Sequence, residues 1–304
     1  MRKLLLMLLV VLFGGMQSVS AQMMVKEGNL WSYAHSFIYR VHGNTVTVYT
    51  FYKCEFDGTI ELNGKTYMKL YETGLDEYGR GYGPDYVLGL REENGHVYAD
   101  YDEFMNLFGD FIDPEAKYYD SAMPYTVTED GEVLLYDFTL NEGDYFGPTD
   151  IYAKTYIHGK TQKTMENGEV CDFFHVWRSY YEGFEDEDYD DSLWSEGGEY
   201  DTVISGIGSL ECLIDWLFPR IYPTDGSMPK NWLNVFIADN ELVYKSSDYV
   251  KDVFFDDLVT GIGSVKSDAG RDVKPCLYDL SGRKVDGRPR PGVYIKDGRK
   301  VVVK

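Results

Sequence analysis

The stretch TIELNGKTYMKLYE, residues 59–72, decides the fold class predicted for this chain. Two short runs rich in Thr, Tyr and apolar residues flank the pair Asn63-Gly64. Asn-Gly favours a two-residue type I′ turn, because both central residues of that turn need positive φ angles. The stretch therefore predicts a β-hairpin.

Similar pairs of runs occur on both sides of this stretch. SFIYRV and TVTVYTFY flank residues 42–44, and YVLGLRE and HVYADY flank residues 93–95. IYAKTYI and residues 161–165 flank His158-Gly159, and LNVFIA and ELVYKS flank Asp239-Asn240. EVLLYDFTL, CDFFHVWRSYY and VISGIGSLECLIDWLF continue the β pattern, whereas DEFMNLFGDF (102–111) has the apolar spacing of a short helix. We expect a mainly β fold, an antiparallel meander forming a sandwich or open barrel, and no α/β fold. The 27 Tyr and 16 Phe residues favour the same fold class.

The first 21 residues have the three parts of a signal peptide. Arg2 and Lys3 precede the ten-residue apolar run of 4–13, and small residues lead to Ala21. Ten apolar residues are too few to cross about 30 Å of hydrocarbon as a helix. We expect cleavage between Ala21 and Gln22. No later apolar run approaches the length of a membrane span, so we expect no transmembrane segment.

Charge and composition divide the mature chain near residue 256. The chain has 29 Lys and Arg and 51 Asp and Glu; residues 274–304 hold nine of these bases and three of the acids, and residues 1–3 hold two of the bases. Residues 4–273 therefore carry 18 bases and 48 acids, a net charge of −30, and the tail carries +6. We predict a β-rich domain at 22–255, a polar linker at 256–275 and a β-hairpin tail at 276–304. A body with this negative charge repels the phosphates of nucleic acid, so we do not expect nucleic acid as a partner.

The tail contains two motifs, LYDLSGRKV (277–285) and PGVYIKDGRKVVVK (291–304). In order and spacing they resemble the carboxy-terminal sorting domain of the type IX (Por) secretion system of Bacteroidetes, in the abbreviated form found in Prevotella- and Bacteroides-like proteins. The matching residues are Tyr278, Asp279, Gly282, Arg283, Val285, Gly292, Tyr294, Gly298 and Lys304.

That resemblance implies export by the Sec translocon and the type IX secretion machinery, followed by secretion or attachment to the outer-membrane surface. The alternative is a two-hairpin appendage that packs on the acidic body, in which case we expect a periplasmic protein. Several phrases of the body, such as GKTYMKLYE (64–72) and ISGIGSL (204–210), resemble uncharacterised secreted proteins of the same bacteria. That group implies no activity.

Four cysteines, Cys54, Cys171, Cys212 and Cys276, are widely spaced. An even number in an exported chain permits disulfides, and Cys171 with Cys212 is the favoured pair. Buried free thiols are the alternative.

No catalytic residue can be assigned from the sequence. GIGSL (206–210) lacks the second glycine of a nucleophile elbow, so we interpret Ser209 as part of a turn. The five histidines have no metal-ligand spacing. Asp186, Asp188 and Asp190 match the first ligand positions of a calcium loop, but the later positions do not match. We expect a solvated acidic loop there, with Ca²⁺ as the alternative, and no other cofactor.

These observations favour a secreted or surface-attached, non-enzymatic protein for binding or adhesion, with a glycan or a protein as its ligand. Trp177, Tyr180, Tyr181 and Trp194 are candidate stacking platforms, although aromatic residues in strands more often pack in a core. The alternative function is an exported hydrolase that acts on glycans or peptides through a carboxylate site that the sequence does not reveal.

Overall fold

The computed structural model describes residues 23–41, 44–75, 80–113, 122–149, 153–181, 195–218, 230–251, 254, 277–278, 292–296 and 299–303. The chain divides into two compact units, Met1–Phe255 and Asp256–Lys304. The structure confirms a mainly β fold built from antiparallel sheets.

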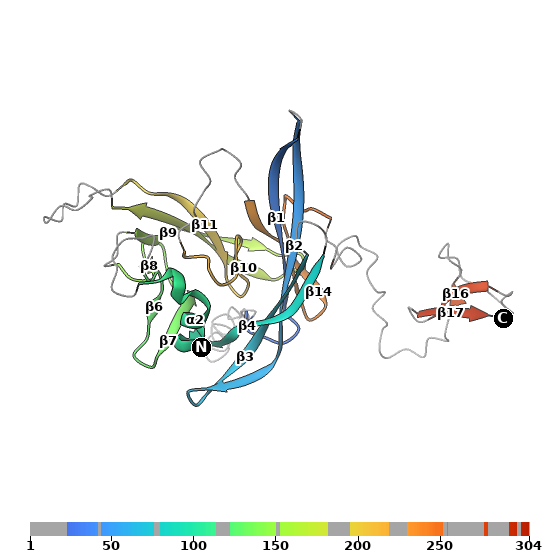
Figure 1. The fold of residues 1–304 in the computed structure, drawn as a ribbon, viewed down its shortest axis with the longest axis horizontal. Helices are drawn as coiled ribbons and strands as arrows, with labels where there is room; N and C mark the ends of the chain where they lie inside the picture. Colours follow the sequence, from blue (N-terminus) through green and yellow to red (C-terminus); the bar gives the residue numbers. More distant parts are fainter. Residues whose placement is uncertain are drawn as a thin grey trace, which may run out of the picture. The chain divides into compact units, whose positions relative to one another are not determined.

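A nine-stranded sheet forms the larger part of the first unit (Figure 1). Its strand order is β14-β13-β1-β2-β3-β4-β5-β7-β6, so most neighbours are also consecutive in sequence, and the last two strands of the unit pair beside β1. The strands are β1 (Leu30–Val41), β2 (Asn44–Leu62), β3 (Lys65–Leu75), β4 (Gly81–Glu93), β5 (His96–Asp100), β6 (Thr126–Val127), β7 (Glu132–Asp137), β13 (Lys230–Ala238) and β14 (Glu241–Lys245).

A five-stranded sheet of order β12-β11-β10-β9-β8 faces the larger one across a shared core. Its strands are β8 (Tyr145–Phe146), β9 (Ala153–Thr164), β10 (Val170–Tyr180), β11 (Gly198–Ile204) and β12 (Gly208–Ser209). The predicted helix is present as α2 (Tyr101–Phe108), followed by the 3₁₀ turn η1 (Gly109–Phe111). The Asp100 side chain caps α2 by accepting from the amides of Asp102 and Glu103.

The hairpin turns with Asn and Gly lie where the sequence predicts them. Asn63 and Gly64 have φ angles of 50° and 78°, and Asn94 and Gly95 have 54° and 81°. Asp239 adopts a φ of 51° between β13 and β14. Side chains that tolerate the left-handed region allow these sharp reversals.

The predicted turn at His158-Gly159 is wrong. Strand β9 continues through both residues, and its pairing with β10 shifts there: His175 lies opposite Gly159, and Val176 lies opposite Ile157. His158 is thus the extra residue of a β-bulge, and its ring stacks on Trp177 at 3.8 Å between centroids. A glycine inside a strand can mark a bulge as well as a turn.

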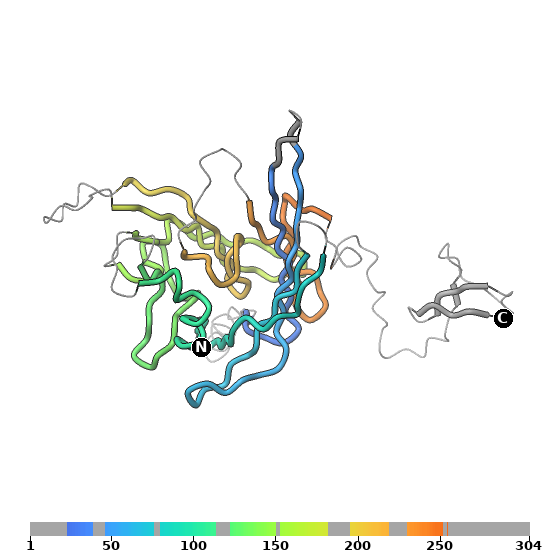
Figure 2. Tube along the Cα trace, viewed as in Figure 1, coloured from blue at the N-terminus to red at the C-terminus, as the bar shows by residue number. Residues whose placement is uncertain are grey.

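The predicted strand over 203–218 is also wrong beyond its first residues. Strand β11 ends at Ile204, and the chain from Ser205 to Phe218 is irregular except for β12. Figure 2 traces this segment, in gold, beside β11. We call residues 205–218 the inner segment, because most of its apolar side chains lie in the core that both sheets share.

Buried aromatic side chains satisfy the backbone of the inner segment. From β1, Trp31 Nε1 donates to the Ile207 carbonyl at 2.8 Å. From β7, the Tyr136 hydroxyl donates to the Leu213 carbonyl at 2.6 Å and accepts from the Ser209 amide at 3.2 Å. Irregular buried backbone needs such partners, because an unpaired polar group costs about 1–3 kcal/mol.

The second unit contains a three-stranded antiparallel sheet of order β15-β16-β17. Its strands are β15 (Leu277–Tyr278), β16 (Gly292–Lys296) and β17 (Arg299–Val303). Tyr278 pairs with Ile295, so the first strand of the tail joins the hairpin that follows it.

Candidate functional site

Three hollows lie along strand β11, and adjacent hollows share lining residues. The first, of about 360 Å³, and the second, of about 400 Å³, share Thr202, Leu210, Tyr244 and Ser247. The second and the third, of about 310 Å³, share Glu199 and Tyr200. We call these three adjoining hollows together the β11 groove. The five β11 residues that line the hollows, 198–202, span about 17 Å, so the groove suits an extended ligand.

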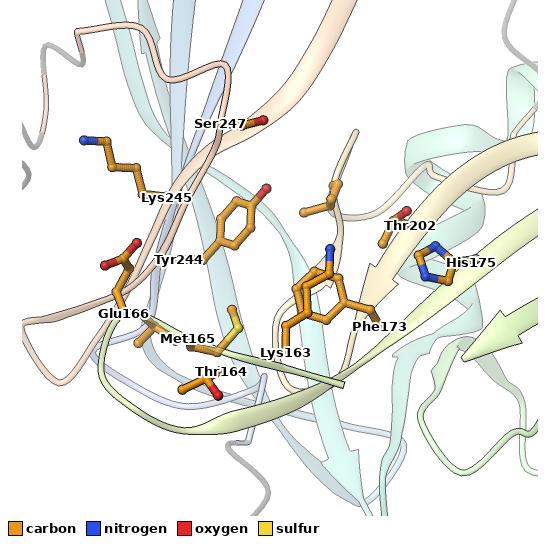
Figure 3. Close-up of a pocket in the computed structure, with 12 residues that line it drawn as sticks. Lys163, Thr164, Met165, Glu166, Phe173, His175, Thr202, Tyr244, Lys245 and Ser247 are labelled. Atoms are coloured by element: carbon orange, nitrogen blue, oxygen red, sulfur yellow. The ribbon is translucent and has the colours of Figure 1, made fainter. Parts of the chain in front are cut away.

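The first hollow lies between the β9–β10 hairpin and β14 (Figure 3). In the close-up, Tyr244 stands in the middle of the hollow, with Glu166 and Lys245 on one side and Phe173 on the other. The Lys163 ammonium lies 4.5 Å from the centre of the Phe173 ring. Burial raises the pKa of Tyr244, with Asp248 adding to the rise against a hydrogen bond with Ser246, so its phenol remains protonated near neutral pH.

The second hollow contains Trp232 and Asn231 at the start of β13. Trp232 Nε1 and Asn231 Oδ1 are shielded from solvent and have no hydrogen-bond partner among the described residues. The indole also packs against Tyr49, with the two rings nearly perpendicular and 6.2 Å between their centroids. Successive side chains of a strand point to opposite faces, so the indole N–H of Trp232 and the amide oxygen of Asn231 are separate features of β13.

The third hollow is built around Arg178, which is 4% exposed. Its guanidinium donates to Thr155 Oγ1 at 2.8 Å and to the Leu217 carbonyl at 2.7 Å. The same group stacks on the Tyr200 ring at 3.7 Å from the centroid. Arg178 thus fixes the end of the inner segment and orients an aromatic face of the groove.

Charges of both signs line the groove. Its lysines are Lys163, Lys230 and Lys245, and its carboxylates are Glu166, Glu196, Glu199, Asp201, Glu211 and Asp248. Two of these groups neutralise each other, since Lys230 pairs with Asp248 at 2.9 Å. Another carboxylate, on Asp201, accepts from the Ser209 hydroxyl. The groove therefore has mixed polarity on an otherwise strongly acidic body.

Glu72 is the carboxyl group whose surroundings come nearest to those of a catalytic acid. Burial raises its pKa, a hydrogen bond from Tyr82 at 3.0 Å opposes the rise, and the charges of Asp215 and Asp85 add to it. Asp85 lies directly opposite Glu72 on the neighbouring strand. Burial also raises the pKa of Glu92, whose carboxylate accepts from the backbone amide of Val25 at 2.9 Å. That bond gives Glu92 a structural role.

Ser209 is a structural residue. It is fully buried, and its hydroxyl accepts from the amides of Glu211 and Cys212 at 3.0 and 3.2 Å. The neighbouring glycines at 206 and 208 have φ angles of 71° and 103°, as a turn requires. A nucleophile would need an accessible hydroxyl beside a base.

The favoured disulfide between Cys171 and Cys212 is wrong: these two residues are not bonded to each other or to Cys54. Cys54 and Cys171 are buried, as in the thiol alternative, and burial raises the pKa of both, that of Cys171 to about 11. Cys276 lies outside the described residues.

Several predicted sites lie outside the described residues. These are the signal cleavage site at Ala21 and Gln22, the calcium candidates Asp186, Asp188 and Asp190, and the tail residues Asp279, Gly282, Arg283, Val285, Gly298 and Lys304. Tyr278 lies in β15, and Gly292 and Tyr294 lie in β16. Within the described part of the chain, no three His, Cys, Asp or Glu side chains gather as metal ligands. None of the helices described there has the length and apolar character needed to cross a membrane.

Comparison with known proteins adds no assignment. A scan against protein-family models found no match, and searches of curated proteins and of solved structures found none either.

Sequence reasoning missed most of the groove. Of the four candidate stacking residues, Tyr180 lines the third hollow, Trp177 stacks on His158, Tyr181 is buried and Trp194 is not described. The aromatic residues that line the groove are Phe173, Tyr180, Tyr200, Trp232 and Tyr244. They come from four strands of two sheets, and only the three-dimensional pairing brings those strands together.

Proposed function

We propose that this protein is an exported, non-enzymatic binding protein that holds an uncharged or weakly charged glycan in the β11 groove. The observation that carries the proposal is the lining of the second hollow. There the aromatic side chain of Trp232 has an indole N–H with no hydrogen-bond partner among the described residues. A small rearrangement that opened this N–H to a ligand would relieve the cost of leaving it unpaired.

A sugar suits this lining better than a charged ligand. Sugar hydroxyl groups donate and accept hydrogen bonds, and the apolar faces of sugar rings stack on aromatic side chains. The mixed charges of the groove do not select an anion or a cation. The three hollows follow β11 in a row, as an oligosaccharide requires. A docking site for a folded protein would instead favour a broad apolar patch.

The export route rests on the two ends of the chain. Residues 1–21 have the order of a signal peptide, and the tail motifs resemble type IX sorting elements. Together they support passage through the Sec translocon and the type IX secretion machinery to the cell surface or the medium. Fractionation of the native host, with and without residues 257–304, tests this route. Retention of the shortened protein in the periplasm would support it, and equal distribution of both versions would refute it.

Binding is tested on a panel of neutral and acidic polysaccharides by affinity electrophoresis, followed by calorimetry on any ligand found. We expect Trp232→Ala to weaken glycan binding at least tenfold, because central aromatic residues dominate binding energies. Trp177→Ala is the matched control, since Trp177 is a partly exposed tryptophan on β10 outside the groove. Absence of binding across the panel, or equal losses in both variants, would refute the glycan site.

The exported hydrolase is the second candidate, and Glu72 is the observation that favours it. A carboxyl with a raised pKa beside two further carboxylates is the arrangement that a general acid needs. Release of reducing ends or peptides by the wild type, abolished in Glu72→Gln, would favour this candidate over simple binding. Turnover that persists in Glu72→Gln, or none in the wild type, would remove Glu72 as its acid.

A further inference from the structure

The hairpin of β1 and β2 extends beyond the sheet that it belongs to. Strand β1 pairs with β13 only as far as Ser36, and β2 begins to pair with β3 only at Tyr52. Beyond these points β1 and β2 pair with each other up to Val41 and Asn44. We call Ile38–Val41 and Asn44–Phe51 the β1–β2 arm. Figure 1 shows it, in blue, projecting past the neighbouring strands.

The outer edge of β2 in the arm has no strand beside it among the described residues. Such an edge presents unpaired peptide groups and is a template for another strand. Its sequence, NTVTVYTF, is rich in residues that favour strands and contains no charge. Natural edge strands are usually protected by charged residues, Pro or a bulge. Residues 44–51 contain no charged residue and no Pro, and the pairing of β2 with β1 has no bulge.

Exposed apolar side chains lie on both faces of the part of the arm whose side chains are described. Ile38 is 41% exposed, and Val46 and Tyr49 are each 44% exposed. Ile38 lies opposite Thr47, so Ile38 and Val46 occupy opposite faces of the hairpin. Exposed aliphatic side chains on both faces of a projecting hairpin indicate a surface that associates.

The arm also lies in the longest stretch of the chain without a carboxylate. No Asp or Glu occurs between Glu27 and Glu55, although the chain contains 51 of these residues. Two bodies of this charge repel each other wherever their acidic surfaces approach. The arm is where two copies can meet without that repulsion.

We propose that two copies of this chain associate through the arm, with the β2 edges pairing antiparallel about a two-fold axis. Such a contact is isologous, because each copy contributes the same strand. The eight residues of β2 in the arm span about 26 Å, roughly three Debye lengths at physiological salt. The paired arms would therefore hold the acidic bodies far enough apart for salt to screen their repulsion.

The test is sedimentation velocity of the mature full-length protein over a range of micromolar concentrations, in low and high salt. We expect a monomer–dimer equilibrium that persists in high salt, since the contact is apolar and hydrogen-bonded. Val46→Glu and Thr47→Lys place like charges near the symmetry axis on opposite faces, and each should weaken dimerisation at least tenfold. Val170→Glu is the control, because Val170 is 43% exposed on a strand outside the arm. Unchanged urea midpoints would show that the variants fold.

Three results would overturn the proposal. A wild type that remains monomeric at all concentrations would exclude the dimer. If that monomer co-sediments with added lipid vesicles, the arm binds lipid and the dimer is likewise excluded. An effect of only one of the two arm variants would indicate docking through one face rather than edge pairing. Equal effects of Val170→Glu and Val46→Glu would show that added charge alone reduces association.

Discussion

Replacement of Glu132 by Gln should destabilise this protein in a pH-dependent way, because Glu132 is the centre of a buried ion network. Its side chain is 3% exposed. The carboxylate accepts from Arg91 Nη2, Lys65 Nζ and the Tyr67 hydroxyl, each at 2.6 Å. Burial alone would raise the pKa of Glu132, but these three partners outweigh it and lower the pKa from 4.5 to about 2.

The size of the effect follows from this pKa. A fall from 4.5 to about 2 corresponds to about 3 kcal/mol of stability at pH 7, since one pKa unit is worth 1.36 kcal/mol. A depressed folded-state pKa means that the unfolded chain binds the proton first as the pH falls. The contribution of Glu132 is therefore complete above about pH 5, about 1.5 kcal/mol at pH 3, and lost below pH 2.

The assay is urea unfolding of the wild type and Glu132→Gln at pH 7 and pH 3, at low protein concentration because the pI is about 4.5. We expect the variant to be less stable by about 3 kcal/mol at pH 7, with the deficit about 2 kcal/mol smaller at pH 3. Glu93→Gln is the matched control. Glu93 also bonds Arg91, at 2.9 Å, but its side chain is 63% exposed, so its loss should cost under about 1 kcal/mol.

A deficit below about 1 kcal/mol at pH 7 would refute the reasoning, because it would show that burial offsets the ion pairs. A deficit of the same size at both pH values would also refute it. In that case the loss would come from packing or hydrogen bonding, and proton linkage would play no part.

Three further predictions concern the interior. Tyr136→Phe should lower the free energy of unfolding, measured by urea titration, by about 2–4 kcal/mol, because it leaves a buried carbonyl and a buried amide of the inner segment unpaired. Tyr145→Phe is the control and should have almost no effect, because Tyr145 is 47% exposed. Gly147→Ala should lower the melting temperature far more than Gly131→Ala, although the two glycines have similar φ angles of 72° and 74°. An added Cβ would lie 2.2 Å from a backbone oxygen at Gly147, whereas at Gly131 no atom lies within 4 Å of it. Cys54 should resist alkylation in the native state and react in urea, as peptide mass spectrometry would show, because burial raises its pKa well above the usual range; rapid native labelling would contradict this.

The hairpins were predictable because their signals are local. Asn63-Gly64, Asn94-Gly95 and Asp239-Asn240 each impose positive φ angles at two adjacent residues, and those angles determine the reversal whatever surrounds it. His158-Gly159 contains a similar local signal, yet the chain continues straight. There the pairing partner decides, since β10 runs alongside β9 on both sides of the bulge.

The groove and the inner segment were not predictable, because distant residues determine them. The sequence 205–218 is apolar enough for a strand, but no local feature shows that Trp31 and Tyr136 supply hydrogen bonds to its backbone. These bonds join residues 176 and 77 positions apart. The Tyr content indicated β-structure through the preference of the ring for pleated surfaces. The tyrosine hydroxyl groups have a second role, as hydrogen-bond partners of the buried backbone, that the composition does not reveal.

That second role explains how the protein orders a long irregular segment where no disulfide joins its described cysteines. The hydrogen bonds of Tyr33, Tyr125 and Tyr136 tie the inner segment to β1, to the chain before β6, and to β7. Each bond alone contributes only about 1 kcal/mol, but its loss exposes two buried groups to the larger cost of remaining unpaired. The inner segment in turn contributes Leu210 and Glu211 to the wall of the β11 groove. The tyrosines that stabilise the core therefore also determine the position of one side of the proposed binding site, so that Tyr136→Phe should weaken ligand binding as well as folding.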